Sequence, residues 1–117
     1  MTRSAPKRPA ARPNDPGILI LTSLAAGPKH GPALAKDIEQ FAGVVLGPGT
    51  LYGALTRLEQ RGLIEPLASD DRRRPYALTA AGRVSLSDAI DDMRRIADAG
   101  AARLRQAEGL RPSGAWS

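Results

Sequence analysis

The fold of this chain is decided by the stretch LGPGTLYGALTRLEQRGLI, which covers residues 46–64. Proline and glycine at its start and Gly62 near its end are typical of a short helix, because proline suits a first turn and glycine suits the residue that follows a last turn. Its apolar positions recur at intervals of four and three residues, and these positions are Leu51, Leu55 and Leu58. The spacing predicts a helix over about residues 48–61 with a leucine face directed into the core.

A first helix is expected near the N-terminus. Pro16 suits a first helical turn, Asp15 can serve as its N-cap, and Gly27-Pro28 ends it. Apolar residues occur on all sides of this helix, so we expect it to be buried.

A second helix is expected over about residues 31–42, with Gly43 as its end. Its apolar stripe consists of Leu34, Ala35, Ile38, Phe41 and Ala42. The short segment 44–46 that follows is either a brief strand or an apolar connector that packs into the core.

A β-hairpin is expected after Gly62. Residues 63–67 are typical of a strand, and Pro66 favours an edge position because it cannot donate to a neighbouring strand. Residues 69–75 form a polar turn with three consecutive arginines, and residues 76–79 return as a second strand.

A long final helix follows, with Thr79 as its cap, over about residues 80–107. Its apolar residues repeat at alternating intervals of four and three, as in a coiled coil. We call these the seam residues: Leu86, Ile90, Met93, Ala97, Gly100 and Leu104. This helix is too long for one small domain to cover, so we expect a homodimer formed through the seam, with Leu21 of the apolar first helix added to the interface. The alternative is that the seam belongs to the intramolecular core.

The order of these elements predicts a mainly α fold with a small β-hairpin, a winged helix-turn-helix with a long C-terminal dimerisation helix. We expect four segments in the chain: a disordered basic tail over residues 1–15, the winged helix-turn-helix over 16–79, the dimerisation helix over 80–107 and a flexible tail over 108–117.

Composition limits the function classes. The 117 residues fit one domain and contain no cysteine and one histidine, which excludes thiolate sites and disfavours a metal cluster or a histidine-based triad. No apolar run approaches the roughly 20 residues that span a bilayer. We therefore expect no cofactor, no membrane contact, no enzymatic activity and a cytoplasmic location. The net charge of +5 includes four basic residues before residue 14, so the remainder nets only +1.

Three motifs resemble the PadR family of bacterial transcription regulators: GPKHG at 27–31, PGTLY at 48–52 and RPYALTAAG at 74–82. The resemblance covers about residues 17–106. It implies a winged-helix fold, a homodimer formed through the last helix, and repression by operator binding, as in the short branch of the family with a single C-terminal helix. Two positions depart from the pattern: Pro32 replaces the usual tyrosine, and Gly53 stands where proline is common.

Double-stranded DNA is the expected partner, and the helix over 48–61 would enter the major groove by its N-terminal end. The candidate DNA-binding residues are Lys36, Pro48, Gly49, Thr50, Leu51, Tyr52, Arg57, Arg72, Arg73, Arg74 and Tyr76. Thr50 would donate to phosphate or touch a base edge, and Tyr52 would reach the DNA backbone. Arg57 would clamp a phosphate or pair with guanine. Two successive half-sites of an inverted repeat would lie on the order of 34–36 Å apart.

Each candidate has a structural alternative. Tyr52 can pack against the second helix, Thr50 can act as a cap, and Arg57 can simply be solvated. The arginines at 72–74 can form a solvated turn, with Asp70 and Asp71 offsetting part of their charge. Two residues before the second helix are further candidates: His30 as a cap or a pH switch, and Lys29 as a phosphate contact.

Two other function classes remain open from the sequence. One is a sensor whose small-molecule effector binds in a cleft between dimer helices, around Met93 and Ile96. The last helix contains no aromatic residue, which disfavours a stacking site for flat molecules. The other is a winged helix used as a protein-interaction module.

Overall fold

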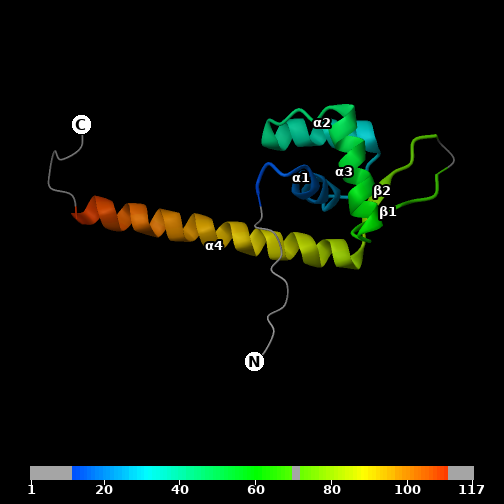
Figure 1. The fold of residues 1–117 in the computed structure, drawn as a ribbon. Helices are drawn as coiled ribbons and strands as arrows, with labels where there is room; N and C mark the ends of the chain where they lie inside the picture. The colour runs from blue at the N-terminus through cyan, green and yellow to red at the C-terminus, as the bar shows by residue number, and fades with distance from the viewer. Residues whose placement is uncertain (1–11, 70–71, 111–117) are drawn as a thin grey trace, which may run out of the picture.

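The computed structural model describes residues 12–69 and 72–110. In these residues four helices and a two-stranded antiparallel sheet follow one another along the chain (Figure 1). The elements are α1 (Pro16–Leu24), α2 (Gly31–Ala42), α3 (Pro48–Gln60), β1 (Ile64–Pro66), β2 (Tyr76–Leu78) and α4 (Ala80–Leu110). The mainly helical fold with one small hairpin is confirmed. Residues 1–11 of the expected basic tail and residues 111–117 of the expected flexible tail lie outside the described residues.

The helix ends follow the local signals in the sequence. The Asp15 carboxylate accepts a hydrogen bond from the backbone N–H of Ile18 at 3.2 Å, so Asp15 is the predicted N-cap of α1. His30 caps α2, where its Nδ1 accepts from the backbone N–H of Ala33 at 3.4 Å. Gly43 and Gly62 have φ angles of 68° and 75°, a left-handed conformation that glycine adopts without steric cost.

Helix α1 lies at the centre of the molecule, between α4 on one side and α2 and α3 on the other (Figure 1). Its apolar surface meets leucine and isoleucine side chains from each neighbouring element. The fully buried large side chains of the core are Ile20, Leu21, Leu34, Ile38, Leu55 and Ile64. The prediction that α1 is buried is therefore confirmed.

Two expectations about apolar residues require correction, and one of two open alternatives is decided. Leu21 is only 2% exposed, since it packs in the core of its own chain and offers no surface to a partner. Phe41 is 47% exposed, because the apolar stripe of α2 is longer than the surface that α1 and α3 cover. Residues 44–46 form a connector rather than a strand, with Val44 and Leu46 packed against the core.

The hairpin has the expected edge proline and a partner that the sequence did not predict. β1 and β2 pair antiparallel, with Ile64 opposite Leu78 and Pro66 opposite Tyr76. On its other side Tyr76 pairs with Lys29 of the α1–α2 connector. The N–H of Lys29 donates to the carbonyl of Tyr76 at 3.1 Å, and the N–H of Tyr76 donates to that of Lys29 at 2.9 Å. The connector thus forms an isolated β-bridge beside the two-stranded sheet.

The start of α4 is fixed against the end of α3. The Thr79 hydroxyl donates to the carbonyl of Gly62 at 2.6 Å and accepts from the N–H of Gly82 at 3.0 Å, which confirms Thr79 as a cap. Gly82 is buried so closely against Leu63 that a Cβ atom there would overlap the Leu63 carbonyl oxygen. Glycine is therefore required at position 82, the third residue of α4.

Helix α4 has 31 residues, which corresponds to a length of about 46 Å. Its first turns pack against α1, with Leu86 and Ala89 less than 10% exposed. Its later turns stand clear of the domain (Figure 1), and there Ile96 is 74% and Leu104 is 68% exposed. The seam therefore has two parts. Leu86 belongs to the core of its own chain, which corrects its assignment to a dimer interface, and only the later residues are uncovered.

Candidate nucleic-acid interface

The first turn of α3 presents unpaired backbone donors at the surface. Pro48, Gly49 and Thr50 are exposed, and the capping residue Gly47 supplies no side-chain acceptor. The N–H groups of a first helical turn have no intrahelical partner, and the helix dipole adds partial positive charge there. This end of α3 can therefore accept a phosphate. The prediction that Leu51 binds DNA is wrong. Leu51 is 3% exposed and packs in the core, so its side chain cannot reach DNA.

Tyr52 packs against the second helix, and its contact with DNA stays a prediction. The residue is 48% exposed. Its hydroxyl packs against Gly31 at the start of α2, where a Cβ atom would lie 2.9 Å from the ring carbon Cζ and would overlap the hydroxyl. The hydroxyl end of Tyr52 therefore packs against α2, as one of the two alternatives predicts. The exposed part of the ring faces solvent.

Arg57 lies on the same exposed stripe as Thr50, because seven residues are close to two full turns of an α-helix. Its guanidinium folds back over Gly53, with Nη1 3.4 Å from the position that a Cβ of Gly53 would take. Gln60 and Arg61 continue the exposed surface at the end of α3. These two residues were not among the predicted DNA-binding residues, although their spacing of three and four from Arg57 was the available signal.

The loop between β1 and β2 extends beside α3 (Figure 1), and we call it the wing. Arg72, Arg73 and Arg74 are all exposed on it. Asp70 and Asp71, expected to offset their charge, lie outside the described residues. The base of the wing is closed by a hydrogen bond from the N–H of Leu67 to the carbonyl of Pro75, 2.8 Å long.

Tyr76 is half-buried against the core, and both its backbone N–H and its carbonyl are paired with Lys29. It is the first residue of β2 and supports the wing, and its contact with DNA stays a prediction.

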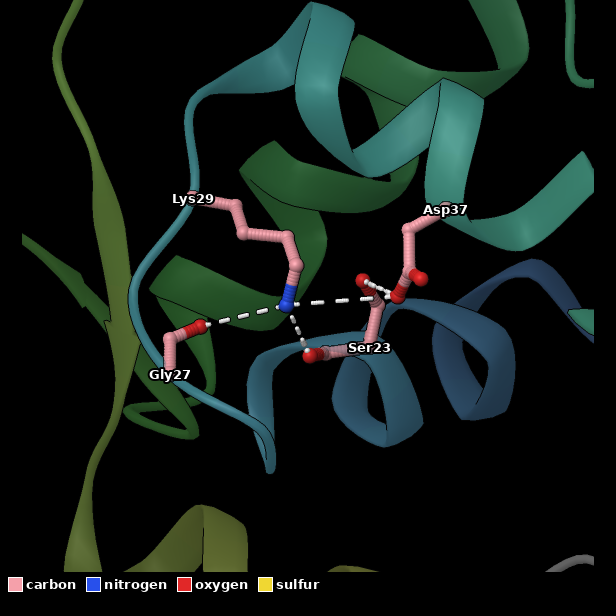
Figure 2. Close-up of polar contacts among 4 residues, drawn as sticks. All are labelled: Ser23, Gly27, Lys29 and Asp37. Atoms are coloured by element: carbon pink, nitrogen blue, oxygen red, sulfur yellow. Dashed lines mark hydrogen bonds and ion pairs between the residues drawn. The ribbon is translucent and has the colours of Figure 1, made fainter. Parts of the chain in front are cut away.

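The two lysines of this region have different surroundings. Lys36 is exposed on α2. The ammonium of Lys29 instead turns inward, donating to the carbonyl of Ser23 at 2.6 Å and lying 3.9 Å from a carboxylate oxygen of Asp37 (Figure 2). Lys29 is therefore not available as a phosphate contact.

A cleft of about 310 Å³ lies between α1, β2 and α4. This cleft lies within one chain and differs from the cleft expected between dimer helices around Met93 and Ile96, which stays a prediction. Its lining residues are Ala25, Leu78, Arg83, Leu86, Ser87, Ile90, Asp91 and Arg94.

Across residues 12–69 and 72–110, no group of three or more histidine or acidic side chains is arranged to hold a metal ion. Within the same residues, no helix has the length and apolarity needed to cross a membrane.

Three packed helices followed by a hairpin and its basic loop define a winged helix-turn-helix DNA-binding domain. Residues 20–88 match the model of the transcriptional regulator PadR-like family, and the chain belongs to this family.

Relatives agree with this assignment. The chain is 49% identical over 85 residues to an uncharacterized 37.1 kDa protein of transposon TN4556 from Streptomyces fradiae, a match over 73% of this chain and 25% of that protein. It is 38% identical over 82 residues to the transcriptional regulator Rv3488 of Mycobacterium tuberculosis, a match over 65% of this chain and 76% of that protein. A crystal structure of a PadR family transcription regulator from Clostridium difficile is 29% identical, with a TM-score of 0.69, and covers 76% of this chain and 97% of that one.

The family defines the general function. Its members are transcriptional regulators and not enzymes, so this chain carries the domain of a transcriptional regulator. The family match ends at residue 88, so the later turns of α4, which stand clear of the domain, lie beyond the match. The chain spans about a quarter of the length of the Streptomyces fradiae protein.

Proposed function

We propose that this protein is a homodimeric repressor that binds an inverted-repeat operator through α3 and the wing. The observation that carries the proposal is the exposed stripe formed by Thr50 and Arg57 on α3, beside the three exposed arginines of the wing. These groups belong to neighbouring elements, because α3 contacts β1 at the base of the hairpin.

Helix α3 would supply both anchoring and sequence recognition. The free N–H groups of its first turn and the Thr50 hydroxyl suit a phosphate at the rim of the major groove. Arg57 has the geometry for bidentate pairing with guanine, which discriminates against a wrong base by about 1–3 kcal/mol. Gln60 and Arg61 extend the same surface toward the next phosphates.

The wing would bind the flanking part of the site. Arg72, Arg73 and Arg74 are exposed. Arginines in a narrow minor groove recognise its shape and its negative potential rather than individual bases. Lys36 on the exposed side of α2 would add a phosphate contact.

The free part of α4 supports the homodimer. Ile96 and Leu104 are large apolar side chains that are 74% and 68% exposed in one chain. Together with the later seam residues Met93, Ala97 and Gly100 they give an apolar stripe that a second copy of α4 would cover. Two-fold symmetry would then place two α3 helices over the two halves of an inverted repeat.

Occupancy of the operator is enough for repression, because a bound dimer blocks access of RNA polymerase to the promoter. A protein with this function acts at the nucleoid, in the cytoplasm.

Selection of bound sequences from a random DNA pool tests the proposal most directly. The expected result is an enriched inverted repeat whose half-sites lie about one helical turn apart. Enrichment of an asymmetric site, or no enrichment above the input pool, would contradict it. Transcription in vitro from a promoter carrying the enriched site should then fall as the protein is added, and a rise would identify an activator.

The cleft between α1, β2 and α4 favours a small-molecule effector as a second role. Its lining combines apolar side chains, among them Leu78 and Leu86, with the charged side chains of Arg83, Asp91 and Arg94. A compound bound there would touch both the hairpin and α4, so it could shift the wing relative to the dimer helix. A thermal-shift screen should find compounds that raise the melting temperature and release DNA, and both effects should weaken in Arg94→Ala.

A further inference from the structure

Lys29, in the short connector between α1 and α2, contacts three elements: α1, α2 and β2. Its ammonium lies at the C-terminal end of α1, where it donates to the carbonyl of Ser23 at 2.6 Å and approaches that of Gly27 at 3.5 Å (Figure 2). The last carbonyls of a helix have no intrahelical donors, and the helix dipole makes this end partly negative. The Lys29 side chain therefore caps α1 from outside the helix.

The same ammonium faces α2. It lies 3.9 Å from Oδ2 of Asp37, and that oxygen accepts a hydrogen bond of 2.6 Å from the hydroxyl of Ser23 (Figure 2). Ser23 is 1% exposed, and the Lys29 side chain is 20% exposed. A partly buried ammonium needs such partners, because burial without them is costly. The Lys29 ammonium thus links Ser23 of α1 to Asp37 of α2.

The backbone of Lys29 carries the connection to the hairpin. Its N–H and carbonyl form two hydrogen bonds with Tyr76, of 3.1 and 2.9 Å. Tyr76 is the first residue of β2, and Arg72 and Arg74 precede it by only four and two residues. The direction of the wing is therefore set where β2 meets Lys29.

We propose that Lys29 is a positioning residue for DNA binding, which fixes the angle of the wing relative to the helix-turn-helix. The inference rests on the proposed function in one respect, namely that the wing arginines contact DNA. Four residues span at most about 13 Å, so a tilt of about 10° at Tyr76 would move Arg72 by up to about 2 Å. A displacement of that size breaks hydrogen-bond geometry at a phosphate.

A double-mutant cycle on DNA affinity separates positioning from direct contact. Lys29→Met keeps the aliphatic stem and removes the charge, and we expect operator affinity about three- to tenfold weaker. In a background with alanine at 72–74, the same substitution should change affinity less than about twofold, because no wing arginine is left to misplace. Lys36→Met is the matched control, and its effect should be equal in both backgrounds. Equal losses from Lys29→Met in both backgrounds would overturn the proposal.

Hydrogen exchange tests the positioning role without DNA. In Lys29→Met the backbone amides at position 29 and at Tyr76 should exchange at least about tenfold faster, while the amides of the core helices keep their protection. Asp37→Asn should show the same pattern more weakly, because it removes the charge and leaves a side chain that still accepts from Ser23. Unchanged exchange at Tyr76 in both variants would refute the role of Lys29. If the wing variant alone binds DNA normally, the proposed function of the wing fails, and the exchange result still decides the role of Lys29.

Discussion

The substitution Gly82→Ala is expected to destabilise the protein, although helix propensity alone predicts the opposite. Alanine is favoured over glycine in a helix interior by about 1 kcal/mol. The backbone at Gly82 adopts an ordinary conformation, because the positive φ angles of the described glycines occur at Gly27, Gly43 and Gly62. The cost must therefore come from contact, and a Cβ at Gly82 would overlap the carbonyl oxygen of Leu63 and lie 3.2 Å from the Leu78 side chain.

The size of the effect follows from these two opposing terms. Overpacking a tight site costs about 1–3 kcal/mol, and a clash with backbone belongs at the upper end because a carbonyl cannot rotate away like a flexible side chain. Subtracting the gain in propensity leaves a net loss of about 2 kcal/mol. With a urea m-value of about 1–3 kcal/mol/M, the midpoint of unfolding should fall by about 1 M.

Urea unfolding followed by circular dichroism at 222 nm measures this change, at one fixed protein concentration because the proposed dimerisation would add to stability. Gly53→Ala in α3 is the control. Its new Cβ would meet only the end of the Arg57 side chain at 3.4 Å, which can move, so this variant should be more stable by up to about 1 kcal/mol. A Gly82→Ala protein as stable as wild type would refute the inferred contact between α4 and the end of α3.

Three further predictions concern the dimer, the wing and the first helix. Leu104→Asp should dissociate the dimer in sedimentation at micromolar concentration, whereas Gln106→Asp, about 200° away on the helix, should leave it intact. Replacing the arginines at 72–74 by alanine should lower the slope of log affinity against log salt by up to about 2.7, with the dimer preserved; an unchanged slope in fluorescence anisotropy would contradict wing contact. Asp15→Ala should cost about 1 kcal/mol in thermal unfolding, because the N–H of Ile18 loses its acceptor.

Most boundaries of the helices could be predicted because their signals are local; the end of α4 is an exception, since the helix continues to Leu110 and not only to about residue 107. Asp15, Gly43 and Gly62 act within one turn of the residues that they terminate, and the leucine spacing in α3 needs only the period of the helix. The hairpin was predictable for the same reason, because its turn and both strands lie within a short span of chain.

The remaining features depend on how distant elements meet. Nothing in the sequence next to Lys29 indicates that its backbone pairs with Tyr76 or that its ammonium turns toward Asp37. The exposure of Phe41 depends on where α1 stops covering α2. A period of seven cannot show where a helix leaves its domain, so Leu86 and Leu104 are equivalent in the sequence pattern although one is buried and the other is not.

The two interior glycines of α4 support the proposed dimer by contrast with each other. Each costs the isolated helix about 1 kcal/mol relative to alanine, so each needs a compensating reason. For Gly82 the reason lies within the chain, because its backbone touches Leu63. At Gly100 an added Cβ would meet nothing within 4 Å in one chain, while the nearby Ile96 and Leu104 side chains are largely exposed. A close approach by a second α4 would explain the glycine and cover both side chains. Gly100→Ala should therefore stabilise a monomeric Leu104→Asp variant and weaken association in the otherwise wild-type chain; stabilisation of both would show that no helix packs against Gly100.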